Sequence, residues 1–316
     1  MTFSIADVSE LQIDFIEYAQ SRGAAAGGAS GAGGAAPKLL VLLSEVQGIW
    51  IDTFQDDPSN LDQLYLLKFP RGKTSLDIDI LRAEYHFYHK LTQMGFETIP
   101  VESMKLIESE RGPSLWLLPR FDYGVEAGAM VSYGMESVYA ILGEPTAKPL
   151  FHSDVIRRLL AAFNKKENYG NTTTLLEAES GIEAFVIEWV RRDLLNIAFG
   201  NSDNHGRNTS FIKYGNRVQF VPIYDFAPMK VDYEMITRIF TWGEGMELGG
   251  VYNFPAIAEH LADLVTLKTL LSALNETAVS LLGLKQRLSH RGPVSILALA
   301  HSGIGYASLD ARMQQY

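Results

Sequence analysis

The sequence contains no cysteine, which excludes disulfide bonds, zinc–thiolate sites and thiol catalysis. It also lacks an uninterrupted run of about eighteen or more apolar residues, so we expect no membrane span. The first residues do not show a basic stretch followed by an apolar run, which argues against a secretion signal. Together these absences favour a cytoplasmic protein.

Basic residues are scarce as well. The 27 Lys and Arg residues are outnumbered by 37 Asp and Glu residues, which gives a formal net charge of −10. Proteins that bind nucleic acids through phosphate contacts usually carry a basic surface, so we expect no direct nucleic-acid binding. By contrast, 316 residues with 47% hydrophobic content are enough to bury a large core and to form two domains.

The most informative segment reads Gly200-Asn-Ser-Asp-Asn-His-Gly-Arg-Asn208, and a second acidic position, Asp225, follows it at short range. An Asp, a nearby Asn and a second Asp suit phosphoryl transfer. Asp203 can orient and deprotonate a hydroxyl nucleophile, while Asn208 and Asp225 can hold Mg²⁺ on the phosphates of ATP. The ordinary alternative is a turn, because Asn, Asp, Gly and Ser cluster in turns for local hydrogen-bonding reasons.

The flanking pattern favours the active-site interpretation over the turn. Residues 182–199 carry apolar side chains at helical spacing, and one face would hold Ile182, Val186, Val190, Leu194 and Ile197. After the loop, residues 209–212 and 218–221 are predicted strands joined by a hairpin turn. A helix, a loop, a hairpin and then an aspartate is the order in which a kinase presents its catalytic loop.

The strongest change in composition covers residues 23–36, which are almost all Gly and Ala. Composition alone favours a flexible linker. However, the apolar run that starts at Lys38 predicts a buried strand, and a Gly-rich segment that leads into a strand is typical of a nucleotide-binding hairpin. We therefore predict a phosphate-binding loop formed by Gly33, Gly34, Ala35, Ala36 and Lys38, preceded by a mobile segment over residues 23–32.

Lys68 ends a predicted apolar strand over residues 64–67, so its ammonium can reach the α- and β-phosphates. A lysine whose stem merely covers apolar surface is the alternative. Residues 79–94 are a predicted helix, on which Glu84 either supplies a carboxylate to Lys68 or remains exposed.

The sequence Phe69-Pro-Arg-Gly-Lys-Thr74 contains the Gly-Lys-Thr of a P-loop. We reject that interpretation because Leu67 stands where the motif requires its first glycine. In addition, no helix-opening pattern follows at once.

The motifs as a set resemble those of the HipA-type serine/threonine kinases, the toxin components of bacterial type II toxin–antitoxin systems. The resemblance lies in Asn201-Ser-Asp-Asn-His-Gly-Arg-Asn208 and Pro222-Ile-Tyr-Asp-Phe-Ala-Pro228. Upstream it is supported, in the family's order, by Gly33-Gly-Ala-Ala-Pro-Lys38, Leu66-Leu-Lys68 and Arg120-Phe-Asp122. It implies an α+β, two-lobed protein-kinase-like fold that uses ATP and Mg²⁺ to phosphorylate a protein hydroxyl.

The resemblance also implies roles for individual residues. Asp203 and Lys68 would be catalytic, and Asn208 and Asp225 would bind the metal. The nucleotide would be contacted by the phosphate loop, by Lys68, and further along the chain by Pro119, Phe121, His205, Asn208, Tyr224 and Asp225. Pro119 stands where the family commonly has an acidic residue, and it has no N–H to donate to the adenine. Self-phosphorylation of Ser30, the serine of the Gly-rich stretch, is a hypothesis.

We expect residues 1–124 to form a mixed α/β N-terminal lobe and residues 125–316 a mainly helical C-terminal lobe. Helices are predicted in the second lobe over residues 154–163, 182–199, 254–264, 266–282 and 294–300. By the resemblance we expect a short form without the N-terminal subdomain of larger family members, which a separate small protein supplies in some short members. The family suggests an antitoxin as a partner, and an aminoacyl-tRNA synthetase or a translation factor as the protein substrate.

Two other functions stay open. A kinase-like enzyme acting on a small molecule or lipid would show a closed, substrate-sized pocket beside Asp203. A non-catalytic pseudokinase that works by complex formation would have no need to keep Asp203, Asn208, Asp225 and Lys68 together.

Overall fold

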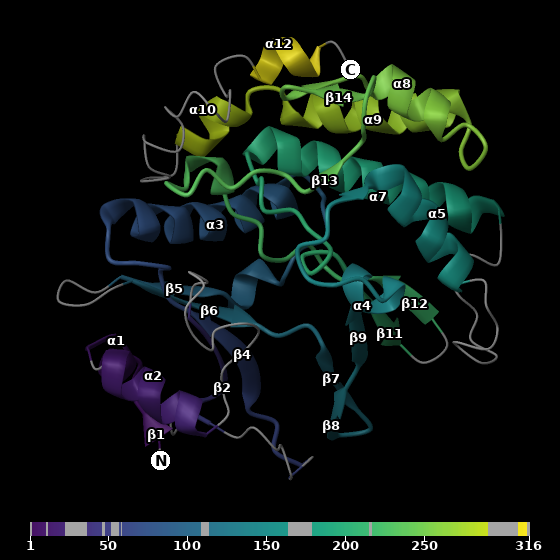
Figure 1. Ribbon diagram of the computed structural model, residues 1–316. Coiled ribbons are helices and arrows are strands. Elements are labelled where there is room, and N and C mark those ends of the chain that lie inside the picture. Colours follow the sequence, from purple (N-terminus) through teal and green to yellow (C-terminus); the bar gives the residue numbers. More distant parts are fainter. Residues whose placement is uncertain are drawn as a thin grey trace. The chain divides into compact units, whose positions relative to one another are not determined.

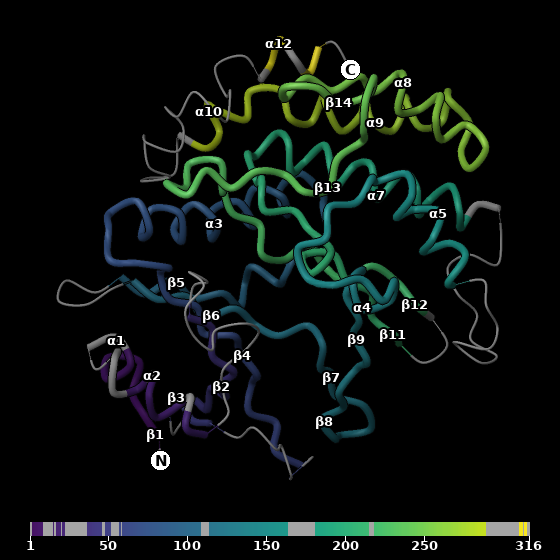
Figure 2. Tube along the Cα trace, viewed as in Figure 1, coloured from purple at the N-terminus to yellow at the C-terminus, as the bar shows by residue number. Residues whose placement is uncertain are grey.

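The computed structural model describes residues 2–10, 12–22, 37–45, 48–51, 57, 59–108, 114–163, 179–214, 217–289 and 309–314. Figures 1 and 2 trace the chain from its N-terminus to its C-terminus. The chain divides into two compact units, Met1–Tyr133 and Gly134–Tyr316, whereas the sequence analysis sets the boundary after residue 124. None of the described helices is long and apolar enough to cross a membrane.

The first unit contains a six-stranded sheet in the order β1-β3-β2-β4-β6-β5, in which every neighbouring pair is antiparallel. Its strands are β1 (Thr2–Phe3), β2 (Lys38–Ser44), β3 (Gly48–Trp50), β4 (Gln63–Lys68), β5 (Lys105–Ile107) and β6 (Leu115–Pro119). The apolar runs of the sequence therefore form the adjacent strands β2, β4 and β6. The same unit holds η1 (Val101–Ser103) and the hairpin of β7 (Tyr123–Glu126) and β8 (Ala129–Ser132).

Helices cover both faces of this sheet. On one face, α1 (Ile5–Glu10) and α2 (Gln12–Ser21) contribute to a buried cluster with alternate residues of the strands, including Leu117. On the other face, the ring of Trp116 lies 5.4 Å from that of Tyr88 on helix α3 (Ser75–Gln93). Figure 1 shows α2 and α3 on opposite sides of the sheet. Because both faces are covered, the central strands are apolar throughout instead of alternating with polar residues.

Helix α3 begins earlier than the predicted range of 79–94. The Thr74 hydroxyl accepts from the Asp77 N–H at 3.2 Å, and the Asp77 carboxylate accepts from the Thr74 N–H at 2.9 Å. This is a capping box, which satisfies backbone donors at the helix start. The sequence-based statement that no helix opens after Gly-Lys-Thr was therefore wrong, while Leu67 still departs from the P-loop motif.

The second unit is built mainly from helices. They are α4 (Val138–Leu142), α5 (His152–Phe163), α7 (Glu179–Phe199), α8 (Phe254–His260), α9 (Leu267–Leu281), α10 (Leu284–Ser289) and α12 (Leu309–Met313). Apart from their ends, α5, α7, α8 and α9 match the predicted helices. The helix predicted over residues 294–300 lies outside the described residues.

Short strands complete this unit. A three-stranded sheet has the order β12-β11-β9, formed by β9 (Gly134–Ser137), β11 (Ser210–Tyr214) and β12 (Arg217–Phe220). Two-stranded pairs join β10 (Leu150–Phe151) to β13 (Phe240–Thr241) and β14 (Glu247–Leu248) to β15 (Val251–Tyr252). A 3₁₀ turn, η2 (Met229–Val231), follows the Asp225 segment. The hairpin predicted after the catalytic loop corresponds to β11 and β12.

Helix α7 is the central element of the second unit and packs against α5 and α9. Of the five residues predicted to share its inward face, Val186, Val190, Leu194 and Ile197 are buried and Ile182 is half-buried. Phe185 and Trp189 continue this core into an aromatic cluster with Phe220 of β12. The C-terminal half of α7 is largely buried, so its polar residues must find partners inside the protein.

Asp193 of α7 is a buried carboxylate, with 1% of its surface exposed. It accepts from the Arg238 guanidinium at 2.8 and 3.1 Å and from the Trp242 indole at 2.8 Å, and His152 Nε2 lies 3.4 Å away. His152 Nδ1 accepts from the indole of Trp189 at 3.0 Å, so Nε2 carries the proton that faces Asp193. Burial by itself would raise the pKa of Asp193, but Arg238 and His152 hold it far below its usual range.

Replacement of Asp193 by Asn should lower the free energy of unfolding by about 3 kcal/mol at neutral pH, because the buried Arg238 guanidinium loses the more buried of its two carboxylate partners and keeps only Glu247 at 3.2 Å. A carboxyl with a depressed folded-state pKa stabilises the fold fully above its unfolded pKa of about 4, and this contribution declines as the pH falls further. The difference between wild type and Asp193→Asn, measured by urea unfolding, should therefore shrink below about pH 4.

The matched control is Asp263→Asn. Asp263 binds Arg157 at 2.6 Å, but 61% of its side chain is exposed, so solvent screens the pair and the cost should stay below about 1 kcal/mol. Equal losses in the two variants, or a difference for Asp193→Asn that does not change with pH, would contradict this account.

Candidate functional site

In the first unit, Lys68 and Glu84 form a buried ion pair. Lys68 lies directly opposite Trp116 in the sheet, so its side chain points to the face covered by α3. There its Nζ is 2.5 Å from a carboxylate oxygen of Glu84, with only 7% of Lys68 and 1% of Glu84 exposed. Of the two alternatives for Glu84, the structure shows the one in which it contacts Lys68.

Lys38, the first residue of β2, lies directly opposite Lys68 in the β2–β4 pairing. Residues opposite one another in an antiparallel pair project from the same face, so the two lysines are cross-strand neighbours. Since Glu84 is paired with Lys68, the two lysines together leave a net positive charge on this face, which suits an anion such as a phosphate. The other members of the predicted phosphate loop, Gly33, Gly34, Ala35 and Ala36, lie outside the described residues, as does Ser30.

The predicted adenine position follows β6. Pro119 is the last residue of that strand, and both it and Phe121 are half-buried. Arg120 donates its backbone N–H to the Leu64 carbonyl at 2.9 Å, and its guanidinium binds both carboxylate oxygens of Asp122 at 3.0 and 2.6 Å. This two-point contact fixes the backbone on both sides of Phe121.

In the second unit, the Asp203 loop starts where α7 ends. Gly200 adopts a left-handed conformation with φ of 74°, which turns the chain out of the helix at little steric cost. The Asp203 N–H donates to the side-chain oxygen of Asn201 at 3.3 Å, and the Asn208 amide donates to the Asp203 carbonyl at 2.7 Å. The loop therefore closes on itself, and this closure brings Asp203 and Asn208 together.

The carboxylate of Asp203 remains accessible, with 37% of the side chain exposed. His205 Nδ1 accepts from the Arg207 N–H at 3.3 Å, so its other ring nitrogen, Nε2, carries the proton. This nitrogen lies 3.7 Å from the Asp203 carboxylate, which is too far for a direct hydrogen bond. His205 thus borders the carboxylate and leaves it open to a hydroxyl group.

Helix α4 supports the loop from behind. The N–H groups of Val138 and Tyr139 donate to the carbonyls of Thr209 and Gly206 at 3.0 and 3.1 Å. Gly206 packs on the ring of Tyr139 so closely that a Cβ there would lie 2.6 Å from a ring carbon. Only glycine fits at this position without displacing the ring or the loop.

Asp225 has an unusual backbone conformation, with φ of 51° in the left-handed region. Few residues other than glycine adopt it, although Asp does so more readily than most, and such a conformation costs about 1–3 kcal/mol. The residues on either side hold it in place. The hydroxyl of Tyr224 donates to the Arg207 carbonyl and bonds Ser210, and the buried ring of Phe226 packs on Phe199 at 5.2 Å.

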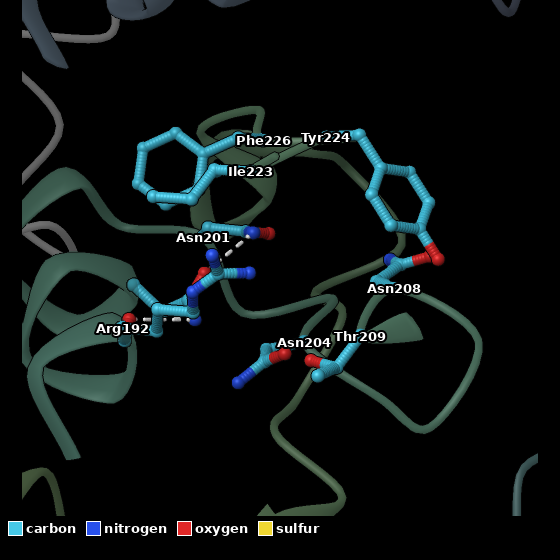
Figure 3. Close-up of a pocket in the computed structure, with 9 residues that line it drawn as sticks. Arg192, Asn201, Asn204, Asn208, Thr209, Ile223, Tyr224 and Phe226 are labelled. Atoms are coloured by element: carbon cyan, nitrogen blue, oxygen red, sulfur yellow. Dashed lines mark hydrogen bonds between the residues drawn. The ribbon is translucent and has the colours of Figure 1, made fainter. Parts of the chain in front are cut away.

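The phenol of Tyr224 stays protonated because burial raises its pKa. It can therefore act as a donor, and it joins the segment of Asp225 to the loop just before Asn208. Figure 3 shows the pocket between these segments, lined by Arg192, Asn196, Asn201, Asn204, Asn208, Thr209, Ile223, Tyr224 and Phe226.

The predicted site residues thus form two groups. The first unit holds Lys38, Lys68, Pro119 and Phe121, and the second holds Asp203, His205, Asn208, Tyr224 and Asp225. The sequence analysis did not identify the supporting residues Tyr139, Arg192 and Asn196. Arg192 and Asn196 lie one turn apart among several other polar and charged residues of α7, so the sequence gave no clear signal for them.

Comparison with known proteins places the chain in one family and relates its fold to solved structures. Residues 30–282 match the family described as "HipA-like C-terminal domain". No curated protein matches the chain significantly. HipA of Shewanella oneidensis MR-1, solved as a toxin–antitoxin complex with HipB and operator DNA, has 17% sequence identity and a TM-score of 0.58. That likeness covers 91% of this chain and 65% of HipA, so the chain spans just under two thirds of that protein's length.

A second solved structure, the proinflammatory kinase CtkA of Helicobacter pylori, has 12% identity and a TM-score of 0.47. The structural match covers 90% of this chain and 89% of CtkA. The likeness to the Shewanella protein shows that the chain has a HipA-like fold.

Replacement of Gly206 by Ala should lower the free energy of unfolding by about 1–3 kcal/mol, because the new methyl group meets the Tyr139 ring. Urea unfolding measures this loss. The control is Gly134→Ala in the same unit, where nothing lies within 4 Å of an added Cβ, so little change is expected. A Gly206→Ala variant as stable as Gly134→Ala would show that the loop does not depend on its contact with α4.

Proposed function

The chain belongs to the HipA-like C-terminal domain family, and on this basis we propose that it is an ATP- and Mg²⁺-dependent serine/threonine protein kinase. The observation that carries the proposal is the loop that connects Asp203 to Asn208. It leaves a carboxylate accessible to a hydroxyl group and ties Asn208 beside it. Tyr224 then joins the same loop to the segment that holds Asp225 in a fixed conformation.

Asp203 would orient the acceptor hydroxyl and take its proton, a contribution of typically about 10²–10⁴-fold. The described residues around Asp203 leave a third of its side chain open, which favours a protein hydroxyl over a small molecule enclosed in a pocket. His205 would limit the directions from which the acceptor can approach.

Asn208 and Asp225 fit a magnesium site by their donor chemistry. The Asn208 Nδ2 is used by the Asp203 carbonyl, which leaves the side-chain oxygen of Asn208 to act as a ligand. The carboxylate of Asp225 would supply a second oxygen, and Mg²⁺ commonly takes one or two such ligands together with phosphate oxygens and waters. When bound, the ion would neutralise charge on the β- and γ-phosphates.

Lys68 would bind the nucleotide phosphates, with Glu84 holding its ammonium in place. Lys38, on the same face of the sheet, would add a second positive charge, and Gly33, Gly34, Ala35 and Ala36 would wrap the phosphates. The adenine would be received at Pro119 and Phe121. Phosphoryl transfer depends chiefly on positioning and charge stabilisation, so each of these groups should affect the rate.

The partners are proposed by analogy with the Shewanella protein, which forms a complex with HipB and operator DNA. This chain would bind an antitoxin of the same kind, and that partner would supply the DNA contacts because the chain has a net charge of −10. The acceptor would be a bacterial protein such as an aminoacyl-tRNA synthetase or a translation factor.

The decisive test is transfer of labelled γ-phosphate from Mg·ATP to the protein itself or to a protein in a bacterial lysate. Replacement of Asp203 by Asn should lower the rate by about 10²–10⁴-fold, because the acceptor proton loses its base. Asn208→Ala, Asp225→Asn and Lys68→Met should each abolish most of the transfer, and chelation of Mg²⁺ should do the same.

The control is Asp263→Asn, which removes an exposed carboxylate of the same unit and should transfer phosphate at the wild-type rate. Label found only on small molecules would favour a phosphotransferase of another specificity. No Asp203-dependent label in any fraction would refute the kinase proposal and favour a pseudokinase.

A further inference from the structure

A continuous series of hydrogen bonds runs through the interior of the second unit, from the strand end before Asp225 to the Asp203 loop. Its middle members are Asn196 of α7 and Asn201, whose amide side chains are both buried. Neither residue is exposed enough to meet a substrate, so their role has to be exerted through the residues that they contact. Both are among the residues that line the pocket between the two segments, and Figure 3 labels Asn201 there.

The two asparagines are joined by two hydrogen bonds. The Asn201 N–H donates to the Asn196 carbonyl at 2.8 Å, and the Asn201 side-chain NH₂ donates to the Asn196 side-chain oxygen at 2.8 Å. Asn196 in turn donates its own NH₂ to the Arg192 carbonyl at 2.9 Å, one turn back along α7. Both ends of each amide are therefore used, which fixes the orientation of the pair.

Toward the loop, the series continues from Asn201. Its side-chain oxygen accepts from the Asp203 N–H at 3.3 Å, and the Asp203 carbonyl accepts from the Asn208 amide at 2.7 Å. The proposed base, Asp203, and one proposed metal ligand, Asn208, therefore both depend on the buried side chain of Asn201.

Toward Asp225, the series continues from Arg192. Its guanidinium donates to the Val221 carbonyl at 2.9 Å and to Glu188 at 2.6 Å, and it lies over the ring of Phe220 at 4.7 Å. Val221 follows β12 and leads into the Asp225 segment. One turn of α7, between Arg192 and Asn196, is therefore a common support for both segments of the site.

We propose that Asn196 and Asn201 are positioning residues, which set the backbone of Asp203 and Asn208 relative to the Asp225 segment. The proposal rests on the kinase function proposed above. Because a misplacement of about 1 Å at a reacting group can cost about 10²-fold in rate, loss of this support should reduce turnover even though no group that touches the substrate is changed.

A purely structural role makes a different prediction. If the asparagine pair only terminates α7, its loss would destabilise the fold, while the folded protein would keep its turnover number. A control variant that destabilises the same unit away from the proposed site distinguishes the two roles. Thr277→Val of α9 is such a variant, because it removes a buried hydroxyl that donates to the Ala273 carbonyl at 2.9 Å and accepts from Arg191 at 3.0 Å.

The experiment compares wild type, Asn196→Leu and Thr277→Val in Mg·ATP-dependent phosphate transfer, at a temperature where urea unfolding shows all three to be folded. We expect Asn196→Leu to lower kcat by about 10–100-fold and to change KM for Mg·ATP much less, because Asn208 is only one of several groups proposed to hold the nucleotide. Thr277→Val should keep the wild-type kcat. Asn196→Asp keeps the oxygen that accepts from Asn201 but loses the donor to the Arg192 carbonyl, so it should recover only part of the loss in kcat.

Hydrogen exchange supplies a readout that does not need activity. Amides of residues 199–208 should exchange faster in Asn196→Leu than in wild type, and at the wild-type rate in Thr277→Val. Equal kcat in Asn196→Leu and Thr277→Val, with an active wild type, would overturn the positioning role and leave the kinase function standing. An inactive wild type would overturn the kinase function, and faster exchange in Asn196→Leu would then mean that the pair is only a helix terminus.

Discussion

The C-terminal half of α7 is largely buried, so its polar side chains must find partners within the protein, and this constraint organises the second unit. Three polar residues lie close together in this half of the helix, and each contacts a different segment. Arg192 reaches Val221, Asp193 reaches Arg238 and Trp242, and Asn196 reaches Asn201. The need to pair these groups therefore fixes three segments that are far apart in the sequence.

The first unit also buries a charged side chain, and there an ion pair accommodates it. Its central strands are covered on both faces, so a charged side chain at the end of β4 cannot reach water without disturbing the packing. Lys68 is accommodated because Glu84 of α3 lies beside it on the same face. A buried ion pair of this kind contributes little net stability, but it defines where an ammonium group is held. In both units, buried polar contacts fix the groups that the proposed chemistry requires.

Much of this arrangement could be predicted from the sequence. The apolar runs predicted β2 and β4, and helical periodicity predicted α5, α7, α8 and α9, because those signals arise from burial along one element. The motif around Asp203 and Asn208 was found because its residue types are demanded by the chemistry. The start of α3 was missed, since the capping box at Thr74 and Asp77 is a local hydrogen-bond pattern that hydrophobic periodicity does not report.

The supporting contacts were harder to predict for a physical reason. Whether Glu84 is buried depends on the sheet that packs against α3, and this cannot be read from the helix alone. Arg192 and Asn196 have the spacing of an exposed helical pair, and only the burial of the C-terminal half of α7 shows that they make internal contacts. Gly206 and Tyr139 are distant in the sequence, so their tight contact could not be predicted from the presence of a glycine in a polar loop.

The pairing of Lys38 with Lys68 across β2 and β4 has a consequence for the ligand-free protein. Like charges directly opposite each other on neighbouring strands repel, but the Lys68 ammonium is paired with Glu84, which offsets part of that cost. An anion bound there would add its own attraction to Lys38 and Lys68. The thermodynamic stability of the protein would then be linked to the anion concentration, and it would rise by about 1.4 kcal/mol for each tenfold increase above the dissociation constant. In its resting form the protein would be least resistant to unfolding when the cell is depleted of the anion.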